Sequence, residues 1–191
     1  MALKDSVLKV LGKKALAFDE TAGSLFVEVP KEHIVACLTL LKNELGFDFL
    51  SDLFGVDNSA LYEKKKKKKK KKGEESEKNG GSVQEKPVPP RFEVIYLLLN
   101  PETNQRLQVR IRVPENDLTV ESATGLWKGA NWPERECFDM FGIKFRGHPY
   151  LKRLLMWDEF PAHPLRKDYP LEGMGEEREL VYEPEGEGHW T

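Results

Sequence analysis

The sequence predicts an α+β fold: a small mixed or antiparallel sheet with a flanking amphipathic helix, followed by a short helix and an extended, irregular C-terminal tail. Three patterns predict this fold. Strand-like and helix-like segments alternate near the N-terminus, two strand-like segments stand together in the middle, and prolines punctuate residues 146–191. A chain of 191 residues with 39% hydrophobic residues can form one main domain with a hydrophobic core.

Residues 1–62 are expected to form a strand–helix–strand unit after a short first helix. Residues 1–14 are mildly amphipathic and lack the apolar centre of an export peptide, so we expect a helix there. Residues 24–29 predict a strand. Residues 47–56 predict a second strand that ends at the polar pair Asp57-Asn58.

The helix of this unit should begin at Pro30 and end at Gly46. Apolar residues recur at helical spacing between these two positions: Ile34, Leu38, Leu41 and Leu45. This spacing predicts an amphipathic helix that packs one face on the core.

Residues 63–90 combine nine consecutive lysines, a Gly-Gly pair and a proline-rich end. Such a composition buries too little apolar surface to offset the entropy of ordering, so we predict a disordered loop. A lysine run can also bind anionic lipid or nucleic acid at low salt, and this alternative stays open.

Residues 91–99 and 106–113 form a β-hairpin pattern with a turn at residues 100–104. Apolar and polar residues alternate in the second strand, so its apolar set should face the core. The opposite face should carry three arginines: Arg106, Arg110 and Arg112. We interpret these arginines as part of the solvent-exposed face of a half-buried sheet. The alternative is that they dock onto an acidic partner or a nucleic acid.

A short helix is predicted over residues 132–141, where Cys137, Met140 and Phe141 form an apolar stripe. Asn131 can cap this helix together with Glu134, and Gly142 should end it.

Charged residues on this helix allow two further interpretations. Arg135 and Asp139 are four residues apart and can pair on the helix surface. Glu134 and Glu136 are two residues apart and therefore point in different directions, which argues against an acid–base pair. We expect them to cap the helix and to form surface or interface ion pairs.

These elements divide the chain into four parts: the unit over 1–62, the lysine-rich loop over 63–90, the hairpin and helix over 91–145 that complete the α+β domain, and an extended interaction tail over 146–191.

The charge balance argues against a dedicated nucleic-acid surface. The formal net charge is −2, and without the nine-lysine run 21 basic residues stand against 32 acidic ones. Phosphate binding needs basic side chains fixed on a folded face, which the acidic remainder does not provide. The longest apolar stretch, residues 94–99, has the length of a strand, so we predict no membrane span.

The sequence also lacks the features of a self-sufficient enzyme. Cys37 and Cys137 form no CxxC pair, so we expect neither an iron–sulfur cluster nor a zinc ribbon from this chain alone. Motifs for dinucleotides, phosphate loops and nucleophile elbows are absent from the sequence. His148 and His163 each precede a proline, which mainly forces an extended backbone, so we do not expect metal ligands there.

Three ordered motifs within residues 130–171 resemble the diagnostic block of the complex I 30 kDa (C) subunit family. They are E-R-E-x-aromatic-D-(L/M)-(F/Y)-G-I-x-F at 134–145, G-H-P-x-L-(R/K)-R at 147–153 and P-L-R-K-D-(F/Y)-P at 164–170. The motif residues expected at a subunit interface are Glu134, Arg135, Glu136, Asp139, Gly142, His148, Pro149, Arg153, His163, Pro164, Arg166, Lys167, Asp168 and Tyr169.

The resemblance implies a structural subunit of the quinone-reducing module in the peripheral arm of proton-translocating NADH–quinone oxidoreductase. The isolated chain would be non-catalytic and would bind no cofactor; FMN, iron–sulfur clusters and quinone would lie in partner subunits. Its neighbours would be the quinone-binding 49 kDa-type subunit (D) and the terminal iron–sulfur subunit (B). The complex would hold it, as a peripheral protein, on the cytoplasmic side of the bacterial inner membrane.

The proline-rich tail is expected to gain order by lying along another subunit. Its possible aromatic anchors are Trp157, Phe160, Tyr169 and Trp190. Arg166, between Pro164 and Pro170, should make a two-pronged bond to a carboxylate of the neighbouring subunit. The alternative is that the tail packs back over its own sheet.

Two other functions stay open on the sequence. One is the equivalent small subunit of a membrane-bound nickel–iron hydrogenase or formate-oxidising complex, since these share the motif block. The other is a free-standing basic adaptor that acts through the lysine run. Copurification with NADH-binding flavoprotein subunits would indicate the oxidoreductase. Copurification with nickel and a hydrogenase large subunit would indicate the hydrogenase or formate-oxidising complex. Strong binding to heparin or DNA would indicate the basic adaptor.

Overall fold

The computed structural model describes residues 3–21, 24–59 and 90–175; nearly all of the predicted lysine-rich loop and Trp190 lie outside these ranges. In chain order its helices and strands are α1 (Leu3–Leu11), β1 (Ala17–Thr21), β2 (Ser24–Glu28), α2 (Ile34–Leu45), β3 (Phe49–Asp57), β4 (Phe92–Asn100), β5 (Gln105–Val113), β6 (Thr119–Glu121), α4 (Asn131–Phe141) and β7 (Lys144–Arg146). Short 3-10 turns occupy Gly12–Lys14, Lys31–His33 and Lys128–Ala130.

Five strands form one mixed sheet in the order β1-β2-β5-β4-β3. β2 and β5 are parallel, and the other neighbouring pairs are antiparallel. The predicted hairpin β4–β5 is confirmed, and it lies between β2 and β3. The α+β prediction is therefore correct, but the strand–helix–strand unit is split, because its two strands are not neighbours in the sheet.

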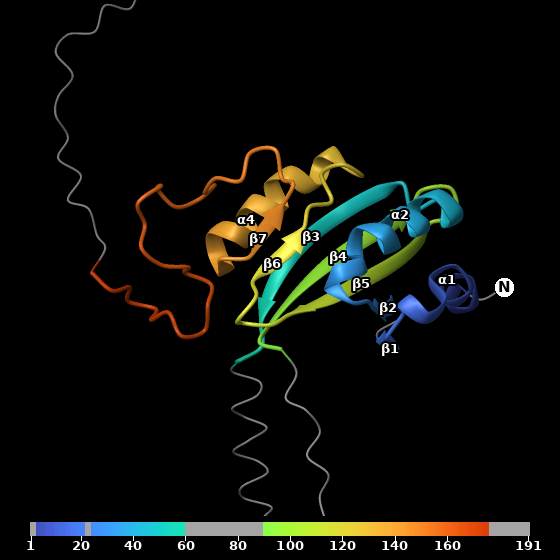
Figure 1. Ribbon diagram of the computed structural model, residues 1–191, viewed down its shortest axis with the longest axis horizontal. Coiled ribbons are helices and arrows are strands. Elements are labelled where there is room, and N and C mark those ends of the chain that lie inside the picture. The colour runs from blue at the N-terminus through green and yellow to red at the C-terminus, as the bar shows by residue number, and fades with distance from the viewer. Residues whose placement is uncertain (1–2, 22–23, 60–89, 176–191) are drawn as a thin grey trace, which may run out of the picture.

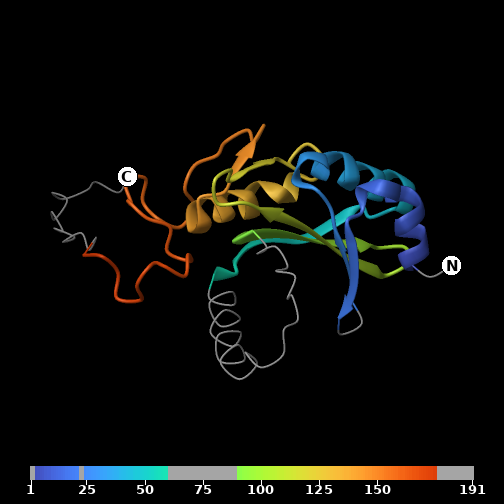
Figure 2. The same cartoon turned by 60° about the horizontal axis from the view of Figure 1, so that its bottom comes forward.

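The described α-helices all lie on one face of this sheet (Figures 1 and 2). α1 packs against α2, and α4 packs against β3. β6 and β7 form a separate two-stranded parallel sheet beside α4. On the opposite face of the large sheet, no helix from the described part of the chain is present (Figure 2).

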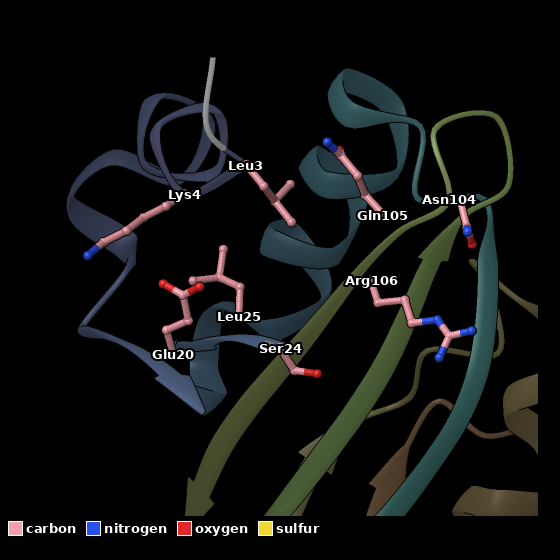
Figure 3. Close-up of a pocket in the computed structure, with 8 residues that line it drawn as sticks. All are labelled: Leu3, Lys4, Glu20, Ser24, Leu25, Asn104, Gln105 and Arg106. Carbon is pink, nitrogen blue, oxygen red and sulfur yellow. The ribbon is translucent and has the colours of Figure 1, made fainter. Parts of the chain in front are cut away.

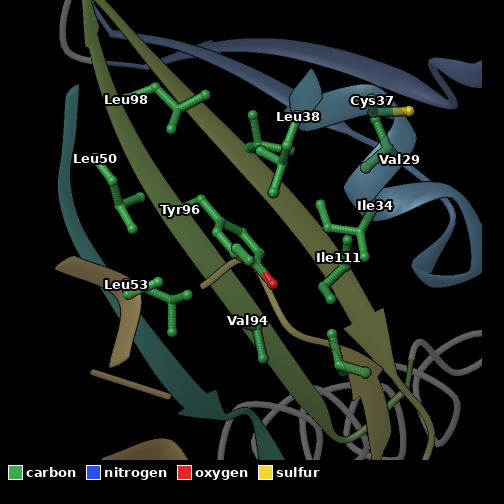
Figure 4. Close-up of a cluster of buried hydrophobic side chains, with 14 of the residues drawn as sticks. Val29, Ile34, Cys37, Leu38, Leu50, Leu53, Val94, Tyr96, Leu98 and Ile111 are labelled. Carbon is green, nitrogen blue, oxygen red and sulfur yellow. The ribbon is translucent and has the colours of Figure 1, made fainter. Parts of the chain in front are cut away.

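The core fills the space between the sheet and the helices (Figure 4). As the helical spacing predicted, Ile34, Leu38 and Leu41 of α2 are completely buried, whereas the fourth predicted residue, Leu45, is half-buried and packs against the core. Tyr96 lies at the centre of the sheet face, fully buried, and its hydroxyl has no hydrogen-bond partner among the described residues. Full burial of each large apolar side chain stabilises the fold by about 1.5–3 kcal/mol.

Gly55 allows α4 to approach the sheet closely. This glycine lies on the helix-covered face of β3, opposite Val94 in the register. A Cβ atom at this position would lie 2.7 Å from Cδ2 of Phe141, so any side chain here would push α4 away.

The structure differs from the sequence-based expectations in the following details. Asn131 is inside α4 rather than its cap: the N-cap residue is Ala130, without a capping side chain. β3 ends at Asp57, as predicted, and the side chain of Asp57 is buried. The strands β1, β6 and β7 were not predicted, because segments of three to five residues are too short to show a clear alternation.

Candidate subunit interface

Residues 147–175, here called the tail, follow β7 without a helix or strand (Figure 1, orange to red). Both ribbon views place the tail at the end of the molecule opposite α1. The predicted extended, irregular segment is therefore confirmed over the described residues. Most of the motif residues lie in the tail or in α4 beside it.

Asp139 on α4 anchors the first part of the tail. Its Oδ1 pairs with Nη1 of Arg153 at 2.7 Å, and its Oδ2 accepts the backbone N–H groups of the three consecutive residues 154–156 at 2.8–3.0 Å. Burial alone would raise the pKa of this carboxyl, but these hydrogen bonds outweigh burial and lower it. The predicted pairing of Asp139 with Arg135 is wrong: Arg135 instead donates to the backbone carbonyls of Lys152 and Arg153.

The tail also caps the C-terminus of α4. The last carbonyl groups of a helix lack partners within the helix. His163 Nδ1 lies 2.9 Å from the carbonyl of Asp139, Leu165 N–H donates to Met140 at 3.2 Å, and Arg166 Nε donates to Phe141 at 2.8 Å. The segment His163–Arg166 therefore satisfies three successive helix carbonyls, and part of its role lies within the chain.

Gly142 is required where this cap forms. It ends α4, as predicted, with a φ of 78°, a conformation that favours glycine. A Cβ atom here would lie 2.6 Å from both His163 Nε2 and Arg166 Nη2. A side chain at position 142 would therefore displace the tail.

A second anchor joins the tail to the end of the sheet. Arg91 Nη2 pairs with Asp57 at 2.8 Å and with Asp168 at 2.9 Å, while Nη1 pairs with exposed Glu115 at 2.7 Å. Asp57 Oδ2 also accepts the backbone N–H of Lys167 at 2.9 Å. Burial alone would raise the pKa of Asp57, but the bonds from Arg91, Lys167 and Ser59 lower it well below its usual range.

The sequence by itself does not predict this second anchor. Asp57 and Arg91 stand at the two sides of the lysine-rich segment, and nothing in their local pattern links them. Only the antiparallel pairing of β3 with β4, in which Asp57 is opposite Phe92, brings them together.

Aromatic side chains stabilise the tail between the two anchors. The rings of Trp157 and Phe160 meet edge to face with centroids 4.8 Å apart, and Tyr169 lies 6.1 Å from Phe160. Phe160 is buried. These predicted anchors therefore contact one another, and the guanidinium of Arg166 lies over the ring of Phe92.

Glu134 is completely buried, unlike the surface or capping residue expected from the sequence. Its carboxyl oxygens accept hydrogen bonds of 2.6 Å from Ser122 Oγ and from the backbone N–H of Ala123. Burial raises the pKa of Glu134 to about 7, despite the opposing effect of these two bonds. Glu134 therefore joins α4 to the segment after β6, whereas Glu136 is exposed.

His148 also acts within the chain. Its Nε2 lies 3.0 Å from the carbonyl of Asn131, and its Nδ1 accepts the backbone N–H of Tyr150. Pro149 and Lys167 are exposed, while Pro164 and Tyr169 are half-buried. Residues of all three motifs thus hold the tail against α4, and contact of these residues with another subunit stays a prediction.

The tail presents apolar side chains to solvent. The exposed large hydrophobic residues of the tail are Tyr150, Leu155, Leu165, Leu171 and Met174. Leu171 is 100% exposed. A segment that is tied down on one side and apolar on the other has the features of a protein interface.

Two surface pockets in the described part of the chain lie elsewhere. One, of about 480 Å³, is bordered by Lys4, Glu20 and Arg106 (Figure 3), and the other, of about 490 Å³, lies between α1 and α2. Their charged side chains are exposed.

In the described ranges no three His, Cys, Asp or Glu residues are grouped to hold a metal, and Cys37 and Cys137 are buried free thiols. No helix in these ranges is long and apolar enough to cross a bilayer.

Fold and site together define a two-layer α+β domain with an outward-facing tail, the class of protein that works as a subunit of a larger assembly. Residues 27–175 match the family described as respiratory-chain NADH dehydrogenase, 30 Kd subunit. The chain belongs to this family. It is a subunit of NADH–quinone oxidoreductase.

Relatives and solved structures agree with this assignment. The C subunit of NADH-quinone oxidoreductase from Citrifermentans bemidjiense is 38% identical over 154 residues, 81% of this chain and 79% of the relative. The C/D subunit of the same enzyme from a Sulfurihydrogenibium species is 40% identical over 157 residues, which are 81% of this chain and 22% of that protein. The trypsin-resistant fragment (1–134) of Nqo5 superposes with a TM-score of 0.59 at 30% identity, covering 79% of this chain and all of the fragment.

A further solved structure shows the fold alone. A chain of the membrane-bound sulfane sulfur reductase, an archaeal respiratory membrane complex, superposes with a TM-score of 0.55 at 19% identity. The match covers 88% of this chain and 85% of that one.

Proposed function

We propose that the chain is a cofactor-free structural subunit in the quinone-reducing module of the peripheral arm, and that its tail docks on the quinone-binding D-type subunit. The observation that carries this proposal is the two-sided tail: Asp139 and Asp57 hold one side, and Leu155, Leu165 and Leu171 are exposed on the other. Apolar groups at the centre of an interface contribute most of its stability.

The choice of a D-type subunit as partner is supported by the fused relative. In the Sulfurihydrogenibium protein, C and D form one polypeptide, so the two parts are held close together there. Electron transfer would use FMN, iron–sulfur clusters and quinone in partner subunits, with the B-type subunit as a second neighbour. The assembly would keep this chain at the cytoplasmic side of the inner membrane.

A double variant tests the tail interface. Leu165→Ser with Leu171→Ser removes exposed apolar groups, so the free chain should melt as the wild type does. Its incorporation into the purified complex should fall about tenfold or more, as expected for hot-spot residues. A matched control, Leu8→Ser with Leu16→Ser, changes exposed leucines on and beside α1 and should assemble normally.

Full assembly of the tail variant, or an equal loss of assembly in the control, would contradict the proposed interface.

The cofactor-free assignment has its own test. The purified chain should show no visible absorption from flavin or iron–sulfur clusters and should not oxidise NADH; stoichiometric iron in the folded chain would refute it.

A further inference from the structure

The face of the sheet opposite the helices carries an apolar stripe, which is interrupted on β3 by the exposed Asp52. The strand register places its members side by side on β3 and β4: Phe49, Phe54, Val56, Ile95, Leu97 and Leu99. Phe49 is 55% exposed and Phe54 37% exposed, and the other four are half-buried. A protein surface rarely displays so many apolar side chains together without a partner.

A row of arginines on β5 runs along one side of this stripe. Arg106 is exposed, and Arg110 and Arg112 both bind the single carboxylate of Glu28, at 2.9 and 2.7 Å. Glu93 on β4 is opposite Arg112, and Asp52 lies on β3, two strands away. Arg106 forms no ion pair with a described residue, so the row can accept further carboxylates at its Arg106 end.

The dimensions of this face limit what can cover it. β3 and β4 have nine residues each and are about 30 Å long, and three strands span about 14 Å. The part of the face that carries the stripe and the arginine row therefore offers about 400 Å², whereas an independent dimer interface buries about 800 Å² on each partner. A helix about 10 Å wide and about 20 residues long would fit it.

We propose that this outer face is a docking site for an amphipathic helix of another subunit, with its apolar side on the stripe and an acidic flank on the arginine row. Packing of helices on sheet faces is the common way to bury such a stripe. The small area makes a second copy of this chain a poor occupant, and Arg106, which forms no ion pair with a described residue, favours a partner with a carboxylate. The tail lies beside α4 and cannot cover this face (Figures 1 and 2), so the site is separate from the proposed tail interface.

Cysteine labelling tests whether the face is covered only in the assembly. Both native cysteines are buried, so Phe54→Cys and Leu97→Cys each introduce the most accessible thiol among the described residues. A bulky maleimide should label both variants readily in the free chain and at least about tenfold more slowly in the complex, where the interface centre excludes solvent. Protection in the free chain would overturn the proposal, because the chain itself or a second copy would then cover the face.

Equal labelling of free and assembled chains would also overturn it. This outcome differs from failure of the tail interface, which would appear as a chain missing from the complex. A photo-crosslinking residue at position 54 then identifies the occupant in the intact complex. The proposal requires a crosslinked peptide from another subunit with helical apolar spacing and flanking Asp or Glu; a peptide from a second copy, or a lipid, refutes it.

Charge reversal tests the arginine row. Arg106→Glu should weaken incorporation about tenfold at low salt and less at high salt, because it opposes an acidic flank. The matched control is Arg146→Glu, an exposed arginine on β7, which should assemble as the wild type does. Equal behaviour of the two variants would show that the row does not bind an acidic partner.

Discussion

Asp57 and Arg91 lie 34 residues apart in the sequence, yet they form an ion pair of 2.8 Å where β3 ends and β4 begins. The Asp57 side chain is completely buried and that of Arg91 is 14% exposed. The pair joins the two sides of the lysine-rich segment and, through Lys167 N–H, holds the tail. A single buried carboxylate thus links the sheet and the tail.

Asp57→Asn should lower the free energy of unfolding of the isolated chain by about 3 kcal/mol, the usual loss when one member of a buried ion pair is removed. Urea denaturation followed by circular dichroism measures this loss. Glu115→Gln removes another partner of Arg91, but one whose side chain is 61% exposed, and it should change stability by less than about 0.5 kcal/mol. Similar losses in both variants would show that burial of Asp57 is not the cause.

Asp139→Asn should release the first part of the tail. The new amide group would face N–H donors instead of accepting from them, so at least one of the three backbone bonds and the Arg153 ion pair would be lost. We expect a loss of about 2–4 kcal/mol. Faster proteolysis within residues 147–158 should accompany it.

The exposed neighbour Glu136 provides the control for Asp139. Glu136→Gln changes a carboxylate on the same helix and should have an effect of less than about 0.5 kcal/mol. Intact resistance of Asp139→Asn to proteolysis would contradict the anchoring role of Asp139.

Glu134 should make stability depend on pH. Its pKa is about 7 in the folded chain and 4.5 without the fold, so the folded state holds the proton more tightly. The stabilisation is complete below pH 4.5 and is lost as pH rises toward 7, by about 1–3 kcal/mol. Glu134→Gln resembles the protonated form and should be more stable than the wild type at pH 8, but not at pH 4.5.

The comparison at each pH separates Glu134 from His163. Burial lowers the pKa of His163, which makes stability rise with pH, but this contribution is common to both proteins. Melting temperatures of both proteins between pH 4.5 and 8 give the difference directly. Parallel melting curves over this range would exclude a buried, protonated Glu134.

Arg166→Lys separates the roles of Arg166 inside and outside the chain. Lysine has no Nε–H to donate to Phe141, so the free chain should lose about 1 kcal/mol of stability. Lysine also cannot make the two-pronged carboxylate bond predicted from the sequence, so incorporation into the complex should fall about tenfold more than stability alone explains. Native-gel quantification at a temperature where both chains are folded measures this; normal incorporation would make the interfacial carboxylate prediction wrong.

Several elements could be predicted because their causes are local. The spacing of Ile34, Leu38 and Leu41 determined α2, and the alternation in β5 determined which residues face the core. Gly142 ends α4 because its positive φ is a local requirement. Three linear motifs sufficed to indicate the family, because their residues are continuous in sequence.

The tertiary structure alone decided how these elements meet. The buried state of Glu134, the pairing of Asp139 with Arg153 and the ion pair of Asp57 with Arg91 all depend on contacts between distant segments, which carry no periodic pattern in the sequence. The same reason explains the split order of the sheet, since hydrogen bonds between strands depend on which edges meet and not on the composition of either strand. Local patterns thus determine elements and faces, while the partners of buried charges are determined only when the chain folds, because each charge must find a counter-charge or hydrogen bonds wherever packing places it.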